Sequence, residues 1–301
     1  MRRLAIVLVP LLVMALVVGA VGCGGEGTTI PTPTPTSDLT LGNVIFCSDV
    51  RESGDYDLQP DSTYVRGQVV FAYFDFYGAL SKKEDGDFVM HLNVARLALF
   101  DSTGQEIGAR EDVLDISRTS PFLASSGSLW VYFDAPLIGP LGEYTVEIAI
   151  KDMLSGDTAT ANASFILKEG PLAIDHIRLC SEIRNVREYT IQPNSTYRLG
   201  DTIHVYFEIP GIGTGTIDGE NEIWIKVSRL KLYDPKDRLV ANLADVLSQH
   251  IPYEPLIGAP YMWLYLDIGD DWTIGQYHAE LTVEDGWTGE TATETFNFSV
   301  E

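Results

Sequence analysis

The sequence matches itself at an offset of 133 residues, and the match holds along most of the chain without a gap. Residues 59–64 (QPDSTY) fall on residues 192–197 (QPNSTY), and Cys47 falls on Cys180. Further matched pairs are Trp130 and Trp263, Gly142 and Gly275, Tyr144 and Tyr277, and Phe165 and Phe298. A period of this length is the size of a small domain and is too long for the unit of a solenoid. The chain is therefore predicted to contain two copies of one domain, at residues 39–168 and 172–301.

Each copy contains short segments in which apolar and polar residues alternate, as they do along a β-strand. In the first copy these segments are residues 41–47, 67–77, 88–100, 105–114, 128–134, 143–151 and 157–167, and the second copy repeats them 133 residues later. No segment sustains the period of a helix, although residues 239–247 could form one or two helical turns. Seven short strands per copy predict an all-β fold, with two tandem seven-stranded β-sandwiches.

Comparison of the copies indicates which side of each strand faces the core. The positions that are apolar in both copies are Val70, Ala72, Phe74 and Phe76, then Leu129, Val131 and Phe133, then Tyr144, Val146, Ile148 and Ile150, with their counterparts. The alternation changes phase between Val94 and Leu97, and again between Val227 and Leu230. A change of phase within a strand predicts a β-bulge in each copy.

The sixth predicted strand of each copy begins with glycine, a variable residue and tyrosine, at Gly142 to Tyr144 and at Gly275 to Tyr277. This motif resembles the start of the penultimate strand in bacterial immunoglobulin-like and fibronectin type III-like modules, where the tyrosine makes a corner contact. The resemblance covers residues 40–167 and 174–301. It implies an immunoglobulin-like fold and no particular function, because such sandwiches carry many activities.

The first 22 residues have the parts of an export signal: Arg2 and Arg3, an apolar run over residues 4–18, and small residues before Cys23. Residues 20–23 (AVGC) resemble a bacterial lipobox, which implies that residues 1–22 are a lipoprotein signal peptide and that Cys23 is lipidated. Simple secretion after a nearby small residue is the alternative. Residues 23–38 are rich in Gly, Thr and Pro and are predicted to form an extended stalk. The expected location is outside the cytoplasm, anchored by lipid to the cell envelope.

Charge and cysteine usage restrict the partners. The chain has 43 acidic and 20 basic residues, a net charge of −23, which argues against nucleic acid and against direct docking on anionic lipid. With Cys23 lipidated, only Cys47 and Cys180 remain. They occupy the same position in the two copies, so they are either small buried residues or a bridge between the copies.

Recognisable catalytic motifs are absent from the sequence. None of the five histidines recurs at the 133-residue offset, and zinc-protease, nucleophile-elbow, Cys-x-x-Cys and phosphate-loop patterns are missing. We therefore expect no enzyme, no catalytic residue and no cofactor, although a site unique to one copy stays open. Asp267, Asp270 and Asp271 are weak candidates for calcium ligands, and solvated loop charges are the alternative.

The candidate binding face consists of aromatic residues that point away from the predicted core on the strands at 67–77 and 128–134. Its members are Phe71, Tyr73, Trp130 and Tyr132, with counterparts His204, Tyr206, Trp263 and Tyr265. Solvent-facing strands normally carry polar residues, so a row of rings indicates a partner such as a sugar or a protein. Alternatively, a connecting segment or the other domain covers these rings.

The loops at residues 51–67 and 184–200 are closely matched between the copies, and Arg51 and Arg184 could contact a ligand. In the alternative interpretation the segment simply crosses from one sheet to the other. The leading functional hypothesis is a lipid-anchored, non-enzymatic binding or adhesion protein, whose ligand is an unknown envelope protein or glycan. The alternatives are a structural spacer or accessory component of a cell-envelope assembly and, less favoured, an envelope hydrolase or inhibitor.

Overall fold

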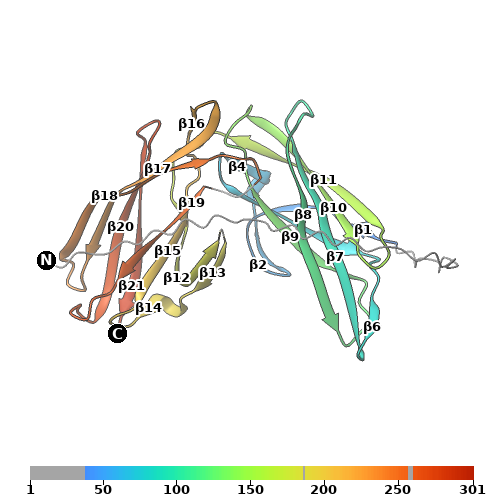
Figure 1. Cartoon of the computed structure of the whole chain (residues 1–301), viewed down its shortest axis with the longest axis horizontal. Coiled ribbons are helices and arrows are strands. Elements are labelled where there is room, and N and C mark those ends of the chain that lie inside the picture. The colour runs from blue at the N-terminus through green and yellow to red at the C-terminus, as the bar shows by residue number, and fades with distance from the viewer. Residues whose placement is uncertain (1–37, 186, 257–259) are drawn as a thin grey trace, which may run out of the picture.

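The computed structural model describes residues 38–185, 187–256 and 260–301. These residues form an all-β fold with four sheets (Figure 1). The predicted signal peptide, Cys23 and all but the last residue of the predicted stalk lie outside the described residues. Among the described residues, no helix is long and apolar enough to span a membrane.

The first copy contains two of the sheets. Its elements are β1 (Thr40–Leu41), β2 (Ile45–Glu52), β3 (Asp55–Leu58), the 3-10 turn η1 (Pro60–Ser62), β4 (Thr63–Val65), β5 (Val69–Tyr77), β6 (Lys82–Glu84), β7 (Asp87–Phe100), β8 (Glu106–Ser120), β9 (Ser126–Asp134), β10 (Gly142–Asp152) and β11 (Thr158–Lys168). One sheet has the order β1-β5-β2-β3, with β9 paired to β5. The other has the order β4-β11-β10-β7-β6, with β8 paired to β7.

The second copy repeats this arrangement. Its elements are β12 (Asp175–Asn185), β13 (Glu188–Ile191), η2 (Pro193–Ser195), β14 (Thr196–Tyr197), β15 (Thr202–Glu208), β16 (Thr214–Ile217), β17 (Glu220–Tyr233), β18 (Leu239–Pro252), β19 (Tyr261–Asp267), β20 (Gly275–Asp285) and β21 (Thr291–Val300). Its sheets are β13-β12-β15-β19, and β14-β21-β20-β17-β16 with β18 paired to β17. In Figure 1 the sheets that contain β2 and β12 lie in the middle of the molecule, and those that contain β7 and β17 lie outside them.

All seven predicted strand segments of the first copy are occupied by strands, and the short strands β3, β4 and β6 are additional. The predicted helical turns at residues 239–247 are wrong, because this segment belongs to β18 and pairs with β17. Here cross-strand pairing overrides local helix propensity. The predicted bulges are confirmed by register shifts between Val94 and Arg96 and between Val227 and Arg229.

The predicted core faces are confirmed in both copies. In the first copy, all the predicted inward residues of β5, β9 and β10 are buried in one apolar cluster, and their counterparts on β15, β19 and β20 and at Ile209, directly after β15, are buried in a second. The tyrosines of the Gly-x-Tyr motif make the expected local contact. The Tyr144 hydroxyl donates to the Pro140 carbonyl at 2.8 Å, and the Tyr277 hydroxyl donates to the Thr273 carbonyl at 2.8 Å.

The matched proline loops cross between sheets, as the structural interpretation of this segment predicts. Turn η1 connects β3, in the first sheet, to β4, which runs parallel to β11 in the second sheet. The residue after the proline adopts a left-handed conformation in both copies, at Asp61 (φ 52°) and Asn194 (φ 54°). Asp and Asn tolerate this region better than most residues, so both copies can make the same turn.

The two copies exchange apolar side chains at their junction. Leu137 of the first copy lies in the core of the second, and Leu256 of the second copy lies in the core of the first. Three hydrogen bonds accompany this exchange. The Arg110 guanidinium donates to the Leu256 carbonyl at 3.0 Å, the Leu137 amide donates to the Tyr253 hydroxyl at 3.1 Å, and the Gly211 amide donates to the Arg66 carbonyl at 2.7 Å. These contacts fix one copy against the other.

Candidate functional site

The aromatic face predicted from the sequence is mostly covered by the protein itself. Phe71, Tyr73 and Tyr206 are buried. The other five members are half-buried: Trp130, Tyr132, His204, Trp263 and Tyr265. The pairing of β5 with β9 does place the first four rings on one face, since Phe71 lies opposite Tyr132 and Tyr73 lies opposite Trp130.

The β2–β3 hairpin covers this face in the first copy. The rings of Tyr56 and Tyr73 lie 4.6 Å apart, and the Gly54 amide donates to the Tyr73 hydroxyl at 3.1 Å. Cys47, Val50 and Val69 complete a small apolar cluster around Phe71 and Tyr73. The face of this sheet that points away from the main core therefore carries a second, smaller apolar core.

The second copy covers the other side of Phe71. The Arg187 guanidinium lies 4.4 Å from the centre of the Phe71 ring, a cation–π distance. Arg178 and Arg187 each lie 3.9 Å from the Asp49 carboxylate. The candidate face of the first copy thus lies at the junction of the copies, and part of its partner is the protein's own second copy.

The corresponding face of the second copy is more open. His204 and Tyr265 are half-buried neighbours, with ring centres 4.8 Å apart in an edge-to-face arrangement. Burial lowers the pKa of His204, which favours the neutral imidazole. This pair leaves a half-buried aromatic surface with a polar edge on the sheet that contains β15 and β19.

A buried ionic network lies next to the junction in the second copy. The Glu208 side chain is 3% exposed, and both of its oxygens contact Arg187 nitrogens at 2.8 Å. The Nδ1 atom of His176 lies 3.2 Å from Glu208 and 3.3 Å from Asp175. The Tyr206 hydroxyl donates to Glu208 at 3.0 Å. A carboxylate this deeply buried is stable as an ion only because cations and donors surround it.

The protonation states of this network follow from its contacts. Burial by itself lowers the pKa of His176, but hydrogen bonds to Asp175 and Glu208 outweigh it and raise the pKa to about 9. For Glu208, burial raises the pKa, and the contacts with His176 and Arg187 more than reverse this and lower it. The network is therefore ionised at neutral pH. It is unique to the second copy, because the counterparts of His176, Arg187 and Glu208 are Asn43, Gly54 and Asp75.

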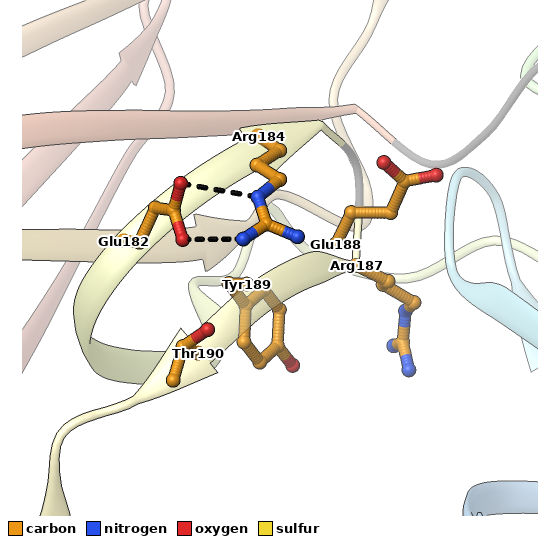
Figure 2. Close-up of a pocket in the computed structure, with 6 residues that line it drawn as sticks. All are labelled: Glu182, Arg184, Arg187, Glu188, Tyr189 and Thr190. Atoms are coloured by element: carbon orange, nitrogen blue, oxygen red, sulfur yellow. Dashed lines mark hydrogen bonds and ion pairs between the residues drawn. The ribbon is translucent and has the colours of Figure 1, made fainter.

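A pocket of about 270 Å³ lies on the β12–β13 hairpin (Figure 2). Its lining residues are Glu182, Arg184, Arg187, Glu188, Tyr189 and Thr190. Figure 2 shows Arg184 facing Glu182, with contacts of 3.1 and 2.7 Å, while Arg187 points away from this pair. Arg184 is therefore already paired with a carboxylate, in an exposed ion pair of little energetic value.

Arg51 occupies the equivalent hairpin of the first copy and is also paired. Its guanidinium contacts Asp55 at 2.5 Å and Asp57 at 2.8 Å. Both arginines that were predicted as possible ligand contacts thus form ion pairs with neighbouring carboxylates on their own hairpins. The shared sequence of these loops is accounted for by the hairpin and the sheet crossing.

The candidate calcium ligands Asp267, Asp270 and Asp271 are not gathered into a metal-binding group. In the described part of the chain, no three His, Cys, Asp or Glu residues are grouped so that they could hold a metal ion. Asp267 accepts a hydrogen bond from the Thr202 hydroxyl at 2.7 Å, and Asp270 and Asp271 are exposed. Their surroundings fit the alternative interpretation of solvated loop charges.

Cys47 and Cys180 are buried free thiols, so they do not bridge the copies. Burial raises the pKa of each thiol to about 11. Neutral thiols in apolar surroundings are unreactive. Their role is to fill space beneath the hairpins.

An aromatic cluster on the outer sheet of the second copy was not anticipated from the sequence. The Trp224 ring stacks on His250 at 4.7 Å and meets Trp287 edge-on at 5.6 Å. The Lys226 ammonium lies 4.3 Å from the centre of the Trp224 ring. Because these groups pack on one another, the cluster stabilises the surface of the sheet and leaves little free ring face for a ligand.

Among the residues that the structure describes, the most exposed large apolar side chains lie in the β8–β9 connection of the first copy. Phe122 is 77% exposed and Leu123 is 69% exposed, whereas Leu256, the counterpart of Leu123, is fully buried between the copies. We call Phe122 and Leu123 the outer docking loop, and Pro255 and Leu256 the inner docking loop. The only sequence signal was a leucine shared at the two positions, which indicates neither exposure nor contact.

No family model and no curated protein match the chain. Among solved structures it is similar to dimeric latent PorU from Porphyromonas gingivalis, with 13% identity and a TM-score of 0.31 over 92% of this chain and 21% of that chain. The chain therefore spans about a fifth of the length of that structure. A TM-score this low shows neither a shared family nor a shared function.

Proposed function

We propose that this protein is a lipid-anchored, extracytoplasmic binding protein without enzymatic activity, built from two tandem immunoglobulin-like domains. The outer docking loop carries the proposal. Its phenylalanine and leucine are 77% and 69% exposed, on a chain whose equivalent leucine is buried in an interdomain contact. Exposed apolar residues grouped at one site mark a binding surface, and here the same position already performs that role in the second copy.

Two features support the immunoglobulin-like assignment. The strand segments follow the seven predicted positions in each copy. The tyrosine at the start of β10 and of β20 donates to a backbone carbonyl four residues upstream, as in the tyrosine corner of such sandwiches. The fold supplies a rigid support, and the loops at its ends supply contacts.

A structural spacer is the second candidate, and the junction between the copies favours it. The exchange of Leu137 and Leu256 and the buried Glu208 network hold the two copies in one arrangement. A spacer needs this rigidity and needs no ligand. Under this alternative, the outer docking loop has no partner.

Changing the outer docking loop separates these functions. The double variant Phe122→Asp, Leu123→Asp is expected to abolish capture of a partner from an envelope membrane fraction. Its unfolding free energy should change by no more than about 0.5 kcal/mol, because both side chains are exposed. The control is Met153→Asp, which changes another exposed apolar residue and should leave capture intact. Equal capture by the double variant and the unaltered chain would refute the role of this loop.

The lipid anchor is tested separately at Cys23. Cys23→Ala removes the thiol that a lipobox cysteine acylates, so the protein should move from the detergent phase to the aqueous phase on phase partitioning. Thr29→Ala, in the same segment, should not change the partitioning. If Cys23→Ala stays in the detergent phase, the chain is held to the membrane by something other than this cysteine.

A further inference from the structure

The outer docking loop lies beside the point where the predicted stalk enters the first copy. The first described residue, Asp38, passes directly over Gly78, since a Cβ placed on Gly78 would overlap the Asp38 carbonyl. Immediately after Gly78, the Ala79 amide donates to the Ser125 carbonyl at 3.0 Å. Ser125 lies two residues beyond Leu123 in the β8–β9 connection. The end of the stalk and the outer docking loop therefore share one end of the first copy.

Further contacts place the loop next to the β6–β7 hairpin. The Ser81 hydroxyl donates to the Ala124 carbonyl. Ser120, at the end of β8, lies opposite Phe88 of β7, and Phe88 lies opposite Lys83 of β6. In Figure 1, this hairpin lies at the end of the first copy that points away from the second copy. The outer docking loop is therefore free to meet a partner outside the molecule.

The surface at this end is apolar. Residues 121–123 are three consecutive exposed residues, and Tyr77, the last residue of β5, is 50% exposed. Tyr77 pairs with Thr40 of β1 and with Ser126 of β9, so it lies between the end of the stalk and the loop. The aromatic and aliphatic side chains thus form one patch at the base of the stalk.

Charge at this end does not select a partner of either sign. The β6–β7 hairpin carries exposed lysines together with exposed acidic residues: Lys82, Lys83, Glu84, Asp85 and Asp87. Lys82 already forms an ion pair with Glu84 at 3.1 Å. On a chain with a net charge of −23, this near-balance leaves the apolar side chains as the main feature of the surface. An apolar partner without strong charge therefore fits the loop.

The predicted stalk determines what this end meets. Cys23, the predicted site of the lipid, lies 15 residues before Asp38. Even a fully extended chain of this length keeps Asp38 within about 50 Å of the bilayer that holds the lipid. Because the stalk enters beside the outer docking loop, the loop is on the end of the first copy that lies nearest the membrane. The tether therefore presents a lipid surface to the loop at a high effective concentration.

We infer that the outer docking loop inserts into the lipid bilayer to which Cys23 is anchored. Phe122 and Leu123 enter the boundary between headgroups and acyl chains, and Tyr77, which is apolar with a hydroxyl at its tip, lies at the same boundary. Each large apolar side chain that leaves water favours the bilayer by about tenfold or more. A single lipid chain gives only marginal anchoring, and a second contact makes it stable. This inference rests on the proposed function, whose anchor and binding loop it uses, and it names the partner.

Neutron reflectometry on a supported bilayer of pure phosphatidylcholine tests this inference. The mature chain is coupled through Cys23 to a maleimide lipid, while the buried thiols of Cys47 and Cys180 stay unmodified. The unaltered chain should form a layer in direct contact with the headgroups. In the double variant Phe122→Asp, Leu123→Asp, a layer of water should separate the protein from the bilayer, with a thickness of up to about 50 Å, the reach of the stalk.

Leu58→Asp is the matched control, because Leu58 is 62% exposed and lies far from the loop. Leu58 is opposite Cys47, and Cys47 is opposite Phe71. Phe71 lies six residues before Tyr77 along β5, a distance of about 20 Å. This variant should stay in contact with the headgroups. Thermal melting of both variants should be unchanged, because the altered side chains are exposed.

Two results would overturn the inference: a water layer beneath the unaltered chain, or a double variant that stays in contact with the headgroups. The proposed function is judged independently, because the supported bilayer contains no envelope protein and its tether does not depend on natural lipidation. If the unaltered chain stands away from this bilayer but the change at Phe122 and Leu123 still abolishes capture from the envelope fraction, the loop binds an envelope protein. If capture is also unaffected, both proposals fail.

Discussion

Glu208→Gln is expected to lower the free energy of unfolding by about 3 kcal/mol or more. The amide keeps the size of the side chain and removes its charge, so the Arg187 guanidinium, 2.8 Å away, remains buried without its main counterion. His176, 3.2 Å away, loses one of its two carboxylate partners. The loss can be measured by urea denaturation followed by tryptophan fluorescence.

Asp75→Asn, at the counterpart of Glu208 in the first copy, is the matched control. Asp75 is half-buried and accepts a hydrogen bond from the Ser128 hydroxyl at 2.7 Å. An asparagine oxygen can accept the same bond, so the cost should be at most about 1 kcal/mol. If the two substitutions cost the same, the network around Glu208 contributes no more than an ordinary hydrogen bond.

The dependence on pH gives this network its own signature. The pKa of His176 is raised from 6.5 to about 9 in the folded protein, so its contribution is complete below about pH 6.5 and is lost as the pH rises toward 9. The loss for this group is roughly 3 kcal/mol at most. The thiols of Cys47 and Cys180 add a similar loss only above about pH 8.5. Between pH 6.5 and 8.5, stability should therefore fall in the unaltered chain and fall less in Glu208→Gln.

Most of the fold could be predicted because the sequence contains an internal duplication. Positions such as Val70 and Phe74 are apolar in both copies, which indicates a core position. The comparison therefore separated core positions from apolar residues scattered over the surface. The same comparison located the bulge after Val94, since the alternation changes phase at the same place in both copies. Strand ends were less predictable, because β8 continues to Ser120 through pairing with β7.

The fate of the candidate binding face could not be predicted in the same way. The alternation correctly predicted that Phe71 and Tyr73 point away from the main core. A strand pattern does not reveal what covers that face of the sheet. Their cover comes from the curl of the β2–β3 hairpin and from Arg187, which is far away in the sequence. Both depend on tertiary contacts.

The buried network shows the same limit for charged residues. Glu208 and Asp75 are acidic residues at equivalent positions, and nothing in the local sequence distinguishes their surroundings. Glu208 is buried because His176 and Arg187 replace Asn43 and Gly54 and supply the charges that a buried carboxylate requires. A comparison of the copies could identify these replacements, but only the fold brings the three side chains together.

Leu256→Ala should lower the free energy of unfolding by about 3 kcal/mol, within the range of about 2 to 5 kcal/mol for leucine in a packed core. Leu256 belongs to the second copy but is buried in the core of the first, so its truncation leaves a cavity there and also weakens the coupling between the copies. Calorimetry should therefore show a lower melting temperature and a broader or divided transition.

Leu123→Ala is the matched control, since it makes the same substitution at the equivalent position. Leu123 is 69% exposed and Leu256 is fully buried, so truncation at Leu123 should cost no more than about 0.5 kcal/mol and leave one transition. The two leucines have the same chemistry and the same place in the repeat, and any difference between the variants measures the contact alone. Equal costs would mean that the second copy does not stabilise the first through this loop, and the junction would then owe its stability to Leu137 and the Glu208 network.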